Sequence, residues 1–405
     1  MSNPIRDGGF GSIFNFAAAS SPVNSYFGNV TIDTAAQMAL VAGYSSIYGN
    51  LLISPGCDFP LSLPNLMYVS GTITIDGSVA GCTSLDLSAL VNAGVISINS
   101  NTDLTSIDLS SLTHYGEVGL AINNNAVLVS LDLSSLTTIL GDFPDMFGGN
   151  ELLTTVDLPS LTSIGGALDI ESTDYVTDLS FPALVSVGGT ATISNNPELV
   201  SLDLSALTSV GLDDFVEVTD NPNLISIDLS ALTDLSGETS LFIQDNASLE
   251  TLDLSALASV GGDLYINGNP VLVTLDLSAL TSACTSGFNL EIYENEILSS
   301  LNLSALVEMG GDWLDVTENP ALTSLNLSAL SSVVGTLNIH DDALLSSLSL
   351  PVLASVGADL TIHDNLLLPS ISLPLLTEAD GIACYGNAAL LSFSAPLFTS
   401  CSSNL

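Results

Sequence analysis

The stretch LETLDLSALASVGGDLYINGNPVLVTLDLSAL, residues 249–280, contains the hexapeptide LDLSAL twice, beginning at Leu252 and again at Leu275. Near copies of this unit follow one another through most of the 405-residue chain. Self-similarity at a fixed period of about 20 to 50 residues is typical of solenoids, in which each repeat forms one coil and stacks on its neighbours. We therefore expect one repetitive rod, in place of the two or three compact domains that this length would otherwise suggest.

The anchor of each copy is a Leu-x-Leu pattern that recurs fifteen times, with a spacing of 22 to 26 residues. The copies begin at Leu61, Leu85, Ile107, Leu131, Val156, Leu179, Leu202, Ile227, Leu252, Leu275, Leu301, Leu325, Leu348, Ile371 and Phe393. The alternation at this anchor, and again at a later Leu-x-Ile, indicates short strands with one buried face. Gly-Gly and Asn-Pro pairs indicate the turns between them. The pattern predicts a single all-β solenoid over residues 29–405, with about 15 coils of about 24 residues each.

One copy shows which side chains should fill a coil. Its expected core positions are Leu252, Leu254, Leu257, Val260, Leu264, Ile266 and Leu272, and Gly261 and Gly262 should turn the chain. A polar residue also recurs once per coil. These positions are Asn101, Asn125, Asn196, Asn221, Asn246, Asn269, Asn295, Asn319, Asn365 and Asn387, with Asp342 in one copy. We expect the amides to form a ladder that satisfies backbone groups of the turn and of the neighbouring coil.

The two ends of the chain depart from the repeat. Residues 33–43 predict a short helix that caps the first coil, because Thr34 and Gln37 fit a capping box and Gly43 fits a C-terminal stop. Residues 1–28 contain no repeat and are expected to anchor the rod in a larger assembly. The C-terminal end shows no comparable cap, so Phe393 and Phe398 are expected to stay exposed for a partner.

The charge balance is extreme. Arg6 is the one basic residue, there is no lysine, and 44 acidic residues give a formal net charge of -43. Such a surface repels phosphate backbones and anionic lipid, so we expect neither nucleic-acid binding nor binding to a membrane surface. No apolar run is long enough to insert into a membrane. These traits suit an extracellular surface or a virion, and no cleaved signal peptide is evident.

The motifs YSSIYGNLLI, residues 44–53, and LSLPNLMYVSGTITI, residues 61–75, precede repeated V-G-G-x-L-x-I and N-P-x-L elements. Together they resemble the receptor L-domain superfamily over roughly residues 30–400. That superfamily includes growth-factor receptor ectodomains and repeats of fungal cell-wall and bacterial surface proteins. The resemblance implies a leucine-rich right-handed β-helix with three short strands per coil, and a binding or structural role without enzymatic activity.

The outward residue of the anchor strand is most often aspartate. These positions are Asp86, Asp108, Asp132, Asp157, Asp203, Asp228, Asp253 and Asp276, with serine or asparagine in most other copies. Carboxylates about 5 Å apart repel by about 0.8 kcal/mol per neighbour in water. One interpretation is a row that binds Ca²⁺ or Mg²⁺, which take carboxylate oxygens, and the other is a solvated acidic face. In both interpretations the fold itself does not require the aspartate.

Histidine and cysteine supply the remaining candidates for site chemistry. His340 and His363 occupy equivalent places in adjacent coils, beside aspartates in NIHDD and TIHDN. Imidazoles and carboxylates are ligands of transition metals, and a chance surface pair is the alternative. The five cysteines show no CxxC spacing. Cys57 and Cys82 lie one coil apart and are candidates for a disulfide near the cap, whereas Cys284 is expected in the core.

Aromatic residues predict a contact surface on the outside of the second strand of each copy. Phe242 and Tyr265 should be adjacent there, with Tyr293 and Trp313 nearby. The cluster would contact a sugar or a protein, or would be shielded at a lateral interface. A Thr-row ice-binding surface is disfavoured because the outward residues of this strand are too mixed.

A polysaccharide-acting enzyme is the least favoured function. No Arg or Lys follows Arg6, and a regular ladder offers no pocket that raises the pKa of one carboxyl above that of its neighbour. The sequence therefore predicts a non-enzymatic structural or adhesion rod that binds assembly partners, a second copy of itself or a cell-surface glycan. A ligand-binding receptor-type module is the alternative.

Overall fold

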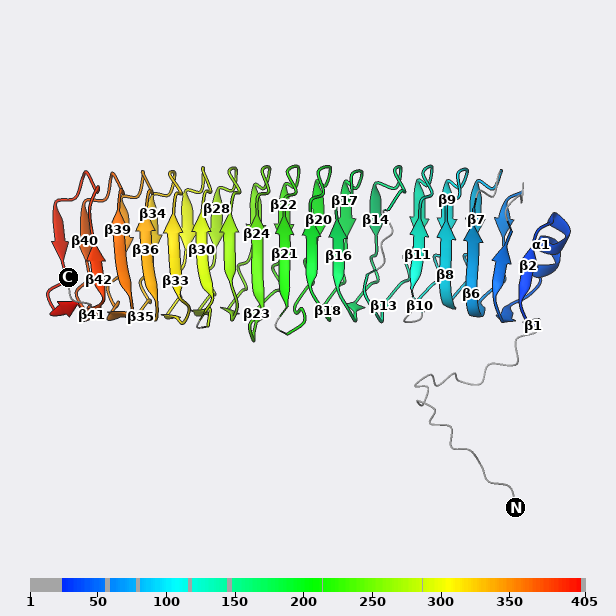
Figure 1. Ribbon diagram of the computed structural model, residues 1–405, viewed down its shortest axis with the longest axis horizontal. Helices are drawn as coiled ribbons and strands as arrows, with labels where there is room; N and C mark the ends of the chain where they lie inside the picture. The colour runs from blue at the N-terminus through cyan, green and yellow to red at the C-terminus, as the bar shows by residue number, and fades with distance from the viewer. Residues whose placement is uncertain are drawn as a thin grey trace, which may run out of the picture.

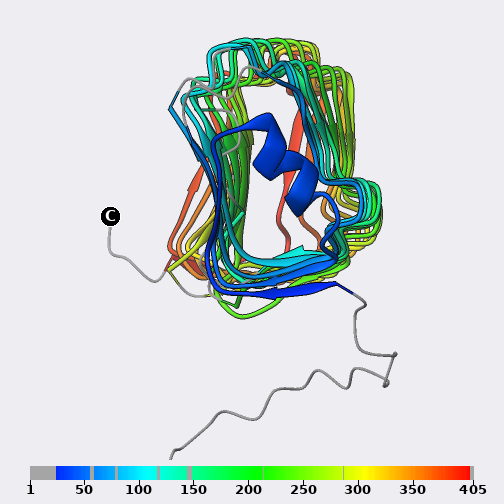
Figure 2. The same cartoon turned by 90° about the vertical axis from the view of Figure 1, so that its right-hand side faces the viewer.

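The computed structural model describes residues 24–401, except 55–58, 78–80, 116–118, 144–147, 213 and 286. Within this part, the chain forms one long rod whose strands run across its axis (Figure 1). Viewed along the axis, successive coils superimpose and enclose a common interior (Figure 2). Strands of neighbouring coils pair in parallel and in register. The predicted all-β solenoid of about 15 coils is confirmed.

The first strand of each coil carries the Leu-x-Leu anchor. These strands are β5 (Leu61–Ser62), β7 (Ser84–Asp86), β9 (Ser106–Asp108), β12 (Ser130–Asp132), β14 (Thr155–Asp157), β17 (Asp178–Ser180), β20 (Ser201–Asp203), β22 (Ser226–Asp228), β25 (Thr251–Asp253), β28 (Thr274–Asp276), β31 (Ser300–Asn302), β34 (Ser324–Asn326), β37 (Ser347–Ser349), β40 (Ser370–Ser372) and β43 (Ser392–Ser394). One anchor strand is present for each predicted copy, so the repeat unit of the sequence is the coil.

The second strand is short and precedes the Gly-Gly turn in many coils. This ladder comprises β1 (Ser25–Phe27), β3 (Ser46–Tyr48), β10 (His114–Tyr115), β13 (Thr138–Ile139), β15 (Ser163–Ile164), β18 (Ser186–Val187), β23 (Asp234–Leu235), β26 (Ser259–Val260), β29 (Ser282–Ala283), β32 (Glu308–Met309), β35 (Ser332–Val333), β38 (Ser355–Val356), β41 (Glu378–Ala379) and β44 (Ser400–Cys401). A side chain on Gly261 would collide with the backbone carbonyl of Gly237 in the preceding coil. Glycine is therefore needed here because the coils approach closely.

The third strand is the longest. Near the N-terminus it comprises β2 (Val30–Ile32), β4 (Leu51–Ile53) and β11 (Leu120–Asn123), while β6 (Tyr68–Asp76) and β8 (Asn92–Asn99) combine the second and third strands. The other ten form one sheet, which we call the long sheet: β16 (Leu168–Glu171), β19 (Ala191–Ser194), β21 (Phe215–Thr219), β24 (Ser240–Gln244), β27 (Leu264–Asn267), β30 (Asn289–Tyr293), β33 (Trp313–Thr317), β36 (Thr336–His340), β39 (Asp359–His363) and β42 (Gly381–Ala383). This sheet carries the candidate aromatic and histidine residues, whereas the candidate aspartates lie on the anchor strands.

The interior of the rod holds the predicted leucines and the asparagine ladder. All seven predicted core side chains between Leu252 and Leu272 are buried. Asn246 shows how the ladder works, because its Nδ2 donates to the carbonyl of Val218 at 2.8 Å in the preceding coil. Its Oδ1 accepts the backbone N–H of Asn221 at 3.2 Å. The predicted ladder is confirmed, and it includes Asn150, which the sequence reading left out.

The N-terminal end of the rod is capped by helix α1 (Ala35–Val41), as predicted (Figure 2). Thr34 Oγ1 accepts the Gln37 N–H at 3.3 Å, and Gln37 Oε1 accepts the Thr34 N–H at 3.1 Å, which completes the capping box. Strand β1 lies within the expected anchor segment, residues 1–28, and already pairs with β3. Residues 1–23 lie outside the described part, so the anchor stays a prediction. No helix in the described part is both long and apolar enough to cross a membrane.

The last described coil has no equivalent cap. Phe393 is 43% exposed, as expected, whereas Phe398 packs partly against the core. Leu391 is 90% exposed.

Candidate functional site

The aspartate row of the anchor strands closes the turn that follows each strand. Asp253 Oδ1 accepts the backbone N–H of Ser255 at 3.0 Å and its hydroxyl at 2.6 Å. The same bond from the N–H two residues later is made by Asp86, Asp108, Asp132, Asp203, Asp228 and Asp276, and also by Asn302 and Asn326. This is an Asx turn. The aspartate thus has a local role in the turn that the sequence did not predict, although asparagine makes the same bond at Asn302 and Asn326 and serine stands at this position in other coils.

The same hydrogen bonds favour the charged carboxylate. The pKa of Asp253 is lowered because Ser255 donates from its hydroxyl and its backbone N–H, which outweighs the effect of burial. At Asp86, burial raises the pKa, but hydrogen bonds from Ser62 and Ser88 together lower it below its usual value. Donors within the protein thus favour the charged form of these two carboxylates. Binding of Ca²⁺ or Mg²⁺ stays a prediction.

Two substitutions of Asp253 separate its roles. Asp253→Asn is expected to leave the urea midpoint of unfolding unchanged, because Asn302 and Asn326 make the same bond. Asp253→Ala should lower the free energy of unfolding by about 1 kcal/mol, the net value of a lost hydrogen bond. If Ca²⁺ stabilises the wild type, both variants should respond less to it. Equal stability of the alanine variant and the wild type would show that the turn does not need the bond.

The aromatic row lies on the outer face of the long sheet, which the structure makes the third strand of each coil and not the second, because a short strand such as β23 or β26 precedes it. Phe242 and Tyr265 are neighbours in register, with ring centroids 5.4 Å apart, as predicted. Phe215 extends the row at 6.1 Å from Phe242. The sequence reading missed it because it stands two positions earlier along its strand and reaches Phe242 diagonally. Trp313 is the first residue of β33, and Tyr293 is the last residue of the neighbouring strand β30. These two predicted contact residues therefore lie apart, at opposite ends of adjacent strands.

Carboxyl groups continue this row along the long sheet. Burial raises the pKa of Glu291, and the nearby charges of Asp315 and Asp263 raise it further. The pKa of Asp315 is also raised, mainly by burial, although the amide of Asn338 donates to its carboxylate at 2.6 Å. Burial raises the pKa of Tyr265 to about 12. Burial thus raises the pKa of both neighbouring carboxyl groups, Glu291 and Asp315, on this open sheet.

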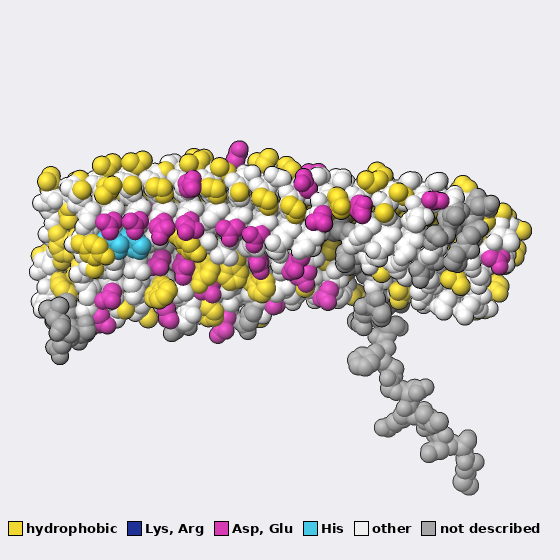
Figure 3. Space-filling view, turned by 45° about the horizontal axis from the view of Figure 1, so that its top comes forward, with side chains coloured by type: hydrophobic (Ala, Val, Ile, Leu, Met, Phe, Trp, Pro, Cys, Tyr) yellow, Lys and Arg dark blue, Asp and Glu magenta, His cyan; other side chains and the backbone are white. Residues whose placement is uncertain are grey.

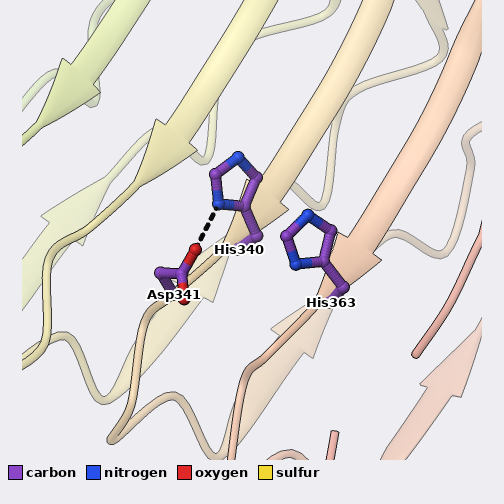
Figure 4. A group of neighbouring side chains, drawn as sticks. All are labelled: His340, Asp341 and His363. Atoms are coloured by element: carbon purple, nitrogen blue, oxygen red, sulfur yellow. Dashed lines mark hydrogen bonds and ion pairs between the residues drawn. The ribbon is translucent and has the colours of Figure 1, made fainter. Parts of the chain in front are cut away.

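The two histidines meet on adjacent strands of the long sheet. His340 and His363 are in register, and their rings stack with centroids 4.4 Å apart and an interplanar angle of 7°. The Tyr385 ring stacks on His363, also at 4.4 Å. His340 Nδ1 contacts Asp341 Oδ2 at 2.9 Å (Figure 4). His363 Nδ1 contacts Asp364 Oδ2 at 2.8 Å. The predicted juxtaposition is confirmed, whereas metal binding stays a prediction.

A second acidic row, absent from the sequence reading, follows the long sheet. Its members precede the buried ladder residue and have left-handed backbone conformations, with φ between 54° and 58°. They are Asp220, Asp245, Glu294, Glu318, Asp341 and Asp364. Figure 3 shows acidic side chains in a line above the two histidines. A shallow groove of about 510 Å³ runs beside this row, lined by Pro270, Pro320 and four carboxylates that include Glu318 and Asp341. The signal was present in the sequence as an acidic residue directly before six of the ladder residues, whereas serine, asparagine or glycine stands there in the other coils.

The cysteines add no reactive site in the described part. Cys284 is buried, as predicted, and burial raises the pKa of its thiol, which keeps it protonated and unreactive. Cys57 lies outside the described residues, so its pairing with Cys82 stays a prediction.

Comparisons with known proteins place the chain in no family. No family model and no curated protein matches it, so the resemblance to the receptor L-domain superfamily stays an interpretation of the repeat motif. Among solved structures, YopM from Yersinia enterocolitica WA-314 is 16% identical, covers 88% of this chain and 90% of its own, and has a TM-score of 0.21. A complex of TLR13 with ssRNA13 is 14% identical, covers 83% of this chain and 71% of its own, and has a TM-score of 0.20. Both TM-scores are too low to carry a conclusion, so the assignment as a leucine-rich parallel β-solenoid rests on the strand pairing and the repeat of the chain itself.

Proposed function

We propose that this chain is a non-enzymatic binding rod, displayed at an extracellular or virion surface as a structural or adhesion element. The observation that supports it best is the aromatic row of Phe215, Phe242 and Tyr265 on the long sheet. Aromatic side chains supply a large contact area at a low cost in conformational entropy. Because paired strands hold these rings, the contact surface is formed before any partner arrives.

The surroundings of the row limit the partner. Glu291, Asp315 and Asn338 follow it along the sheet and offer hydrogen-bond acceptors and an amide. The net charge of -43 disfavours polyanionic partners. The row thus fits a glycan with free hydroxyl groups, or a protein surface that carries basic residues. A receptor-type module, as the L-domain resemblance implies, would use the same face.

Assembly through the N-terminal end is the second part of the proposal. Phe27 is 78% exposed and stacks on Tyr48, with ring centroids 4.8 Å apart and an interplanar angle of 8°. This aromatic pair lies on β1 and β3, at the N-terminal end of the described rod (Figure 1). Sedimentation velocity of the full chain and of a chain without residues 1–23 tests it. We expect filaments or oligomers of the full chain and monomers of the shortened one.

A polysaccharide hydrolase is the weaker alternative. Glu291 and Asp315 are neighbours in register, and a raised pKa would suit a general acid. Both lie on the outer face of an open sheet. Release of reducing ends from immobilised polysaccharides would favour this alternative over the binding rod, provided that Glu291→Gln abolished it.

The adhesion proposal is tested with a panel of immobilised neutral and acidic glycans and surface-protein preparations. We expect the double variant Phe242→Ala and Tyr265→Ala to bind at least about tenfold more weakly, because interface aromatics commonly contribute 2 kcal/mol or more, about 30-fold in affinity. Val334→Ala is the matched control, since Val334 is 59% exposed and lies outside the long sheet. Equal binding by the double variant and the control would show that the aromatic row does not contribute to binding.

A further inference from the structure

A separate site lies on the long sheet beyond the aromatic row. His340, Asp341 and His363 each offer a ligand atom, and these atoms lie within 4.8 Å of one another (Figure 4). We propose that the three side chains bind one divalent transition-metal ion of the Zn²⁺ type, and that the ion clamps two adjacent coils together.

The donor set fits this class of ion. Neutral imidazole nitrogens and a carboxylate oxygen are ligands of Zn²⁺, Ni²⁺ and Cu²⁺, whereas Ca²⁺ and Mg²⁺ take oxygen. Each ring turns Nδ1 toward the acidic residue that follows it, so both Nδ1 atoms face the same side of the stack. Three protein ligands leave at least one position of a tetrahedral ion for water.

The required changes in distance are small, and the two stacked rings must also tilt toward each other so that both Nδ1 lone pairs point at one ion. Metal bonds of about 2.0–2.2 Å place the ligand atoms of a tetrahedral site about 3.4 Å apart. The contact of 2.9 Å between His340 Nδ1 and Asp341 Oδ2 must therefore open by about 0.5 Å. The widest separation, at most 4.8 Å, must close by about 1.4 Å. Side chains that are 24% and 50% exposed, as those of His340 and Asp341 are, have room for such shifts.

The fold does not require histidine at positions 340 and 363. At the position of His340 and His363, the strands β24, β27, β30 and β33 carry Gln244, Asn267, Tyr293 and Thr317. An uncharged polar residue therefore satisfies the solenoid there. The imidazoles also stand beside the acidic groove that ends at Asp341, and its carboxylates raise the local concentration of cations. Ligand chemistry and electrostatics thus favour the same small region.

The site spans β36 and β39, so a bound ion would connect two neighbouring coils near the C-terminal end. A ligand that binds the folded state alone stabilises it by mass action. We therefore expect Zn²⁺ to raise the thermal midpoint and to slow amide exchange in these two coils more than in the N-terminal coils.

The chain has three histidines, which allows a direct test by long-range ¹H–¹⁵N NMR of the full-length protein. Zn²⁺ is titrated in millimolar Mg²⁺, which competes for carboxylates of the acidic rows. We expect the ring signals of His340 and His363 to change at one equivalent and those of His114, on β10, to stay. His114→Gln should bind Zn²⁺ as the wild type does. His340→Ala and His363→Ala should each weaken binding by about 10- to 100-fold.

Asp341→Asn removes the carboxylate ligand without an expected folding defect. Asparagine is tolerated at this left-handed position in other coils, where Asn124 and Asn195 have φ of 57° and 55°. This variant should fold normally and also bind Zn²⁺ at least about tenfold more weakly. Unchanged histidine signals at stoichiometric Zn²⁺ would overturn the proposal. So would equal affinity in the wild type and the double variant His340→Ala and His363→Ala, because binding would then belong to the acidic surface.

Discussion

Asn246→Ala is expected to lower the free energy of unfolding by about 3–6 kcal/mol, one of the largest losses from a single side chain in this rod. The amide is fully buried and donates to the carbonyls of Val218 at 2.8 Å and Gln244 at 3.0 Å. Its oxygen accepts the N–H of Asn221 at 3.2 Å. Alanine would leave these groups buried without partners, and each such group costs about 1–3 kcal/mol.

A matched variant distinguishes the ladder from amides in general. Asn223 lies in the adjacent turn, where its exposed amide donates to the carbonyl of Pro197 at 2.7 Å. Because water can replace this bond, Asn223→Ala should cost less than about 1 kcal/mol. Urea unfolding, followed by circular dichroism, measures both variants. Hydrogen exchange should show the loss concentrated in the coils next to Asn246, because each coil contacts mainly its neighbours. If both variants lost a similar free energy of unfolding, the buried ladder amide would contribute no more to stability than an exposed amide.

The features that sequence predicted best are those that repeat with the coil. Leu252 and Leu254 define a strand by alternation, and the fifteen copies fix its stacking, so core and ladder follow without tertiary information. The capping helix followed from Thr34 and Gln37 because a capping box is local. Asn150 follows Asn125 by 25 residues, the same spacing as between Asn221 and Asn246, so the period alone could have identified this ladder position.

The features that sequence did not predict depend on side-chain direction. Whether Asp253 faces solvent or bonds to Ser255 depends on its rotamer and on the turn, which the alternation pattern does not specify. Phe215 joins the aromatic row through a diagonal contact between coils of unequal length. The raised pKa of Glu291 depends on how far the neighbouring coils bury it. Each of these outcomes requires the register between coils in addition to the period.

Asp342→Asn is expected to stabilise the protein at neutral and alkaline pH. Asp342 is the acidic member of the buried ladder, and its Oδ1 accepts the N–H of Asn319 at 2.9 Å. Its Oδ2 is buried with no hydrogen-bond partner. In the next coil, the ladder residue Asn365 has Nδ2 in place of this oxygen, and that nitrogen donates to the carbonyl of Ile339 at 2.9 Å. An asparagine at position 342 would supply this missing donor and remove a buried charge.

The pH dependence follows from the pKa. Burial raises the pKa of Asp342 to about 8, against the opposing hydrogen bonds from Asn319, whereas an unfolded chain has an Asp pKa near 3.9. Between about pH 4 and pH 8 the folded state holds a proton that the unfolded state has lost. Stability is therefore fully present below pH 4 and falls as the pH rises, by at most about 1.4 kcal/mol per pH unit from this group.

The experiment compares the wild type, Asp342→Asn and Asp359→Asn by thermal unfolding from pH 5 to about pH 8.5, in a range that brackets the folded pKa. Asp359 is an exposed aspartate on β39, close in sequence but outside the ladder. The wild type and the Asp359 variant should lose several degrees of thermal midpoint toward high pH, and the Asp342 variant should lose much less. At pH 8 the Asp342 variant should be the most stable of the three. Parallel pH profiles for all three proteins would contradict the prediction, because the proton that the folded state retains could not then reside on Asp342.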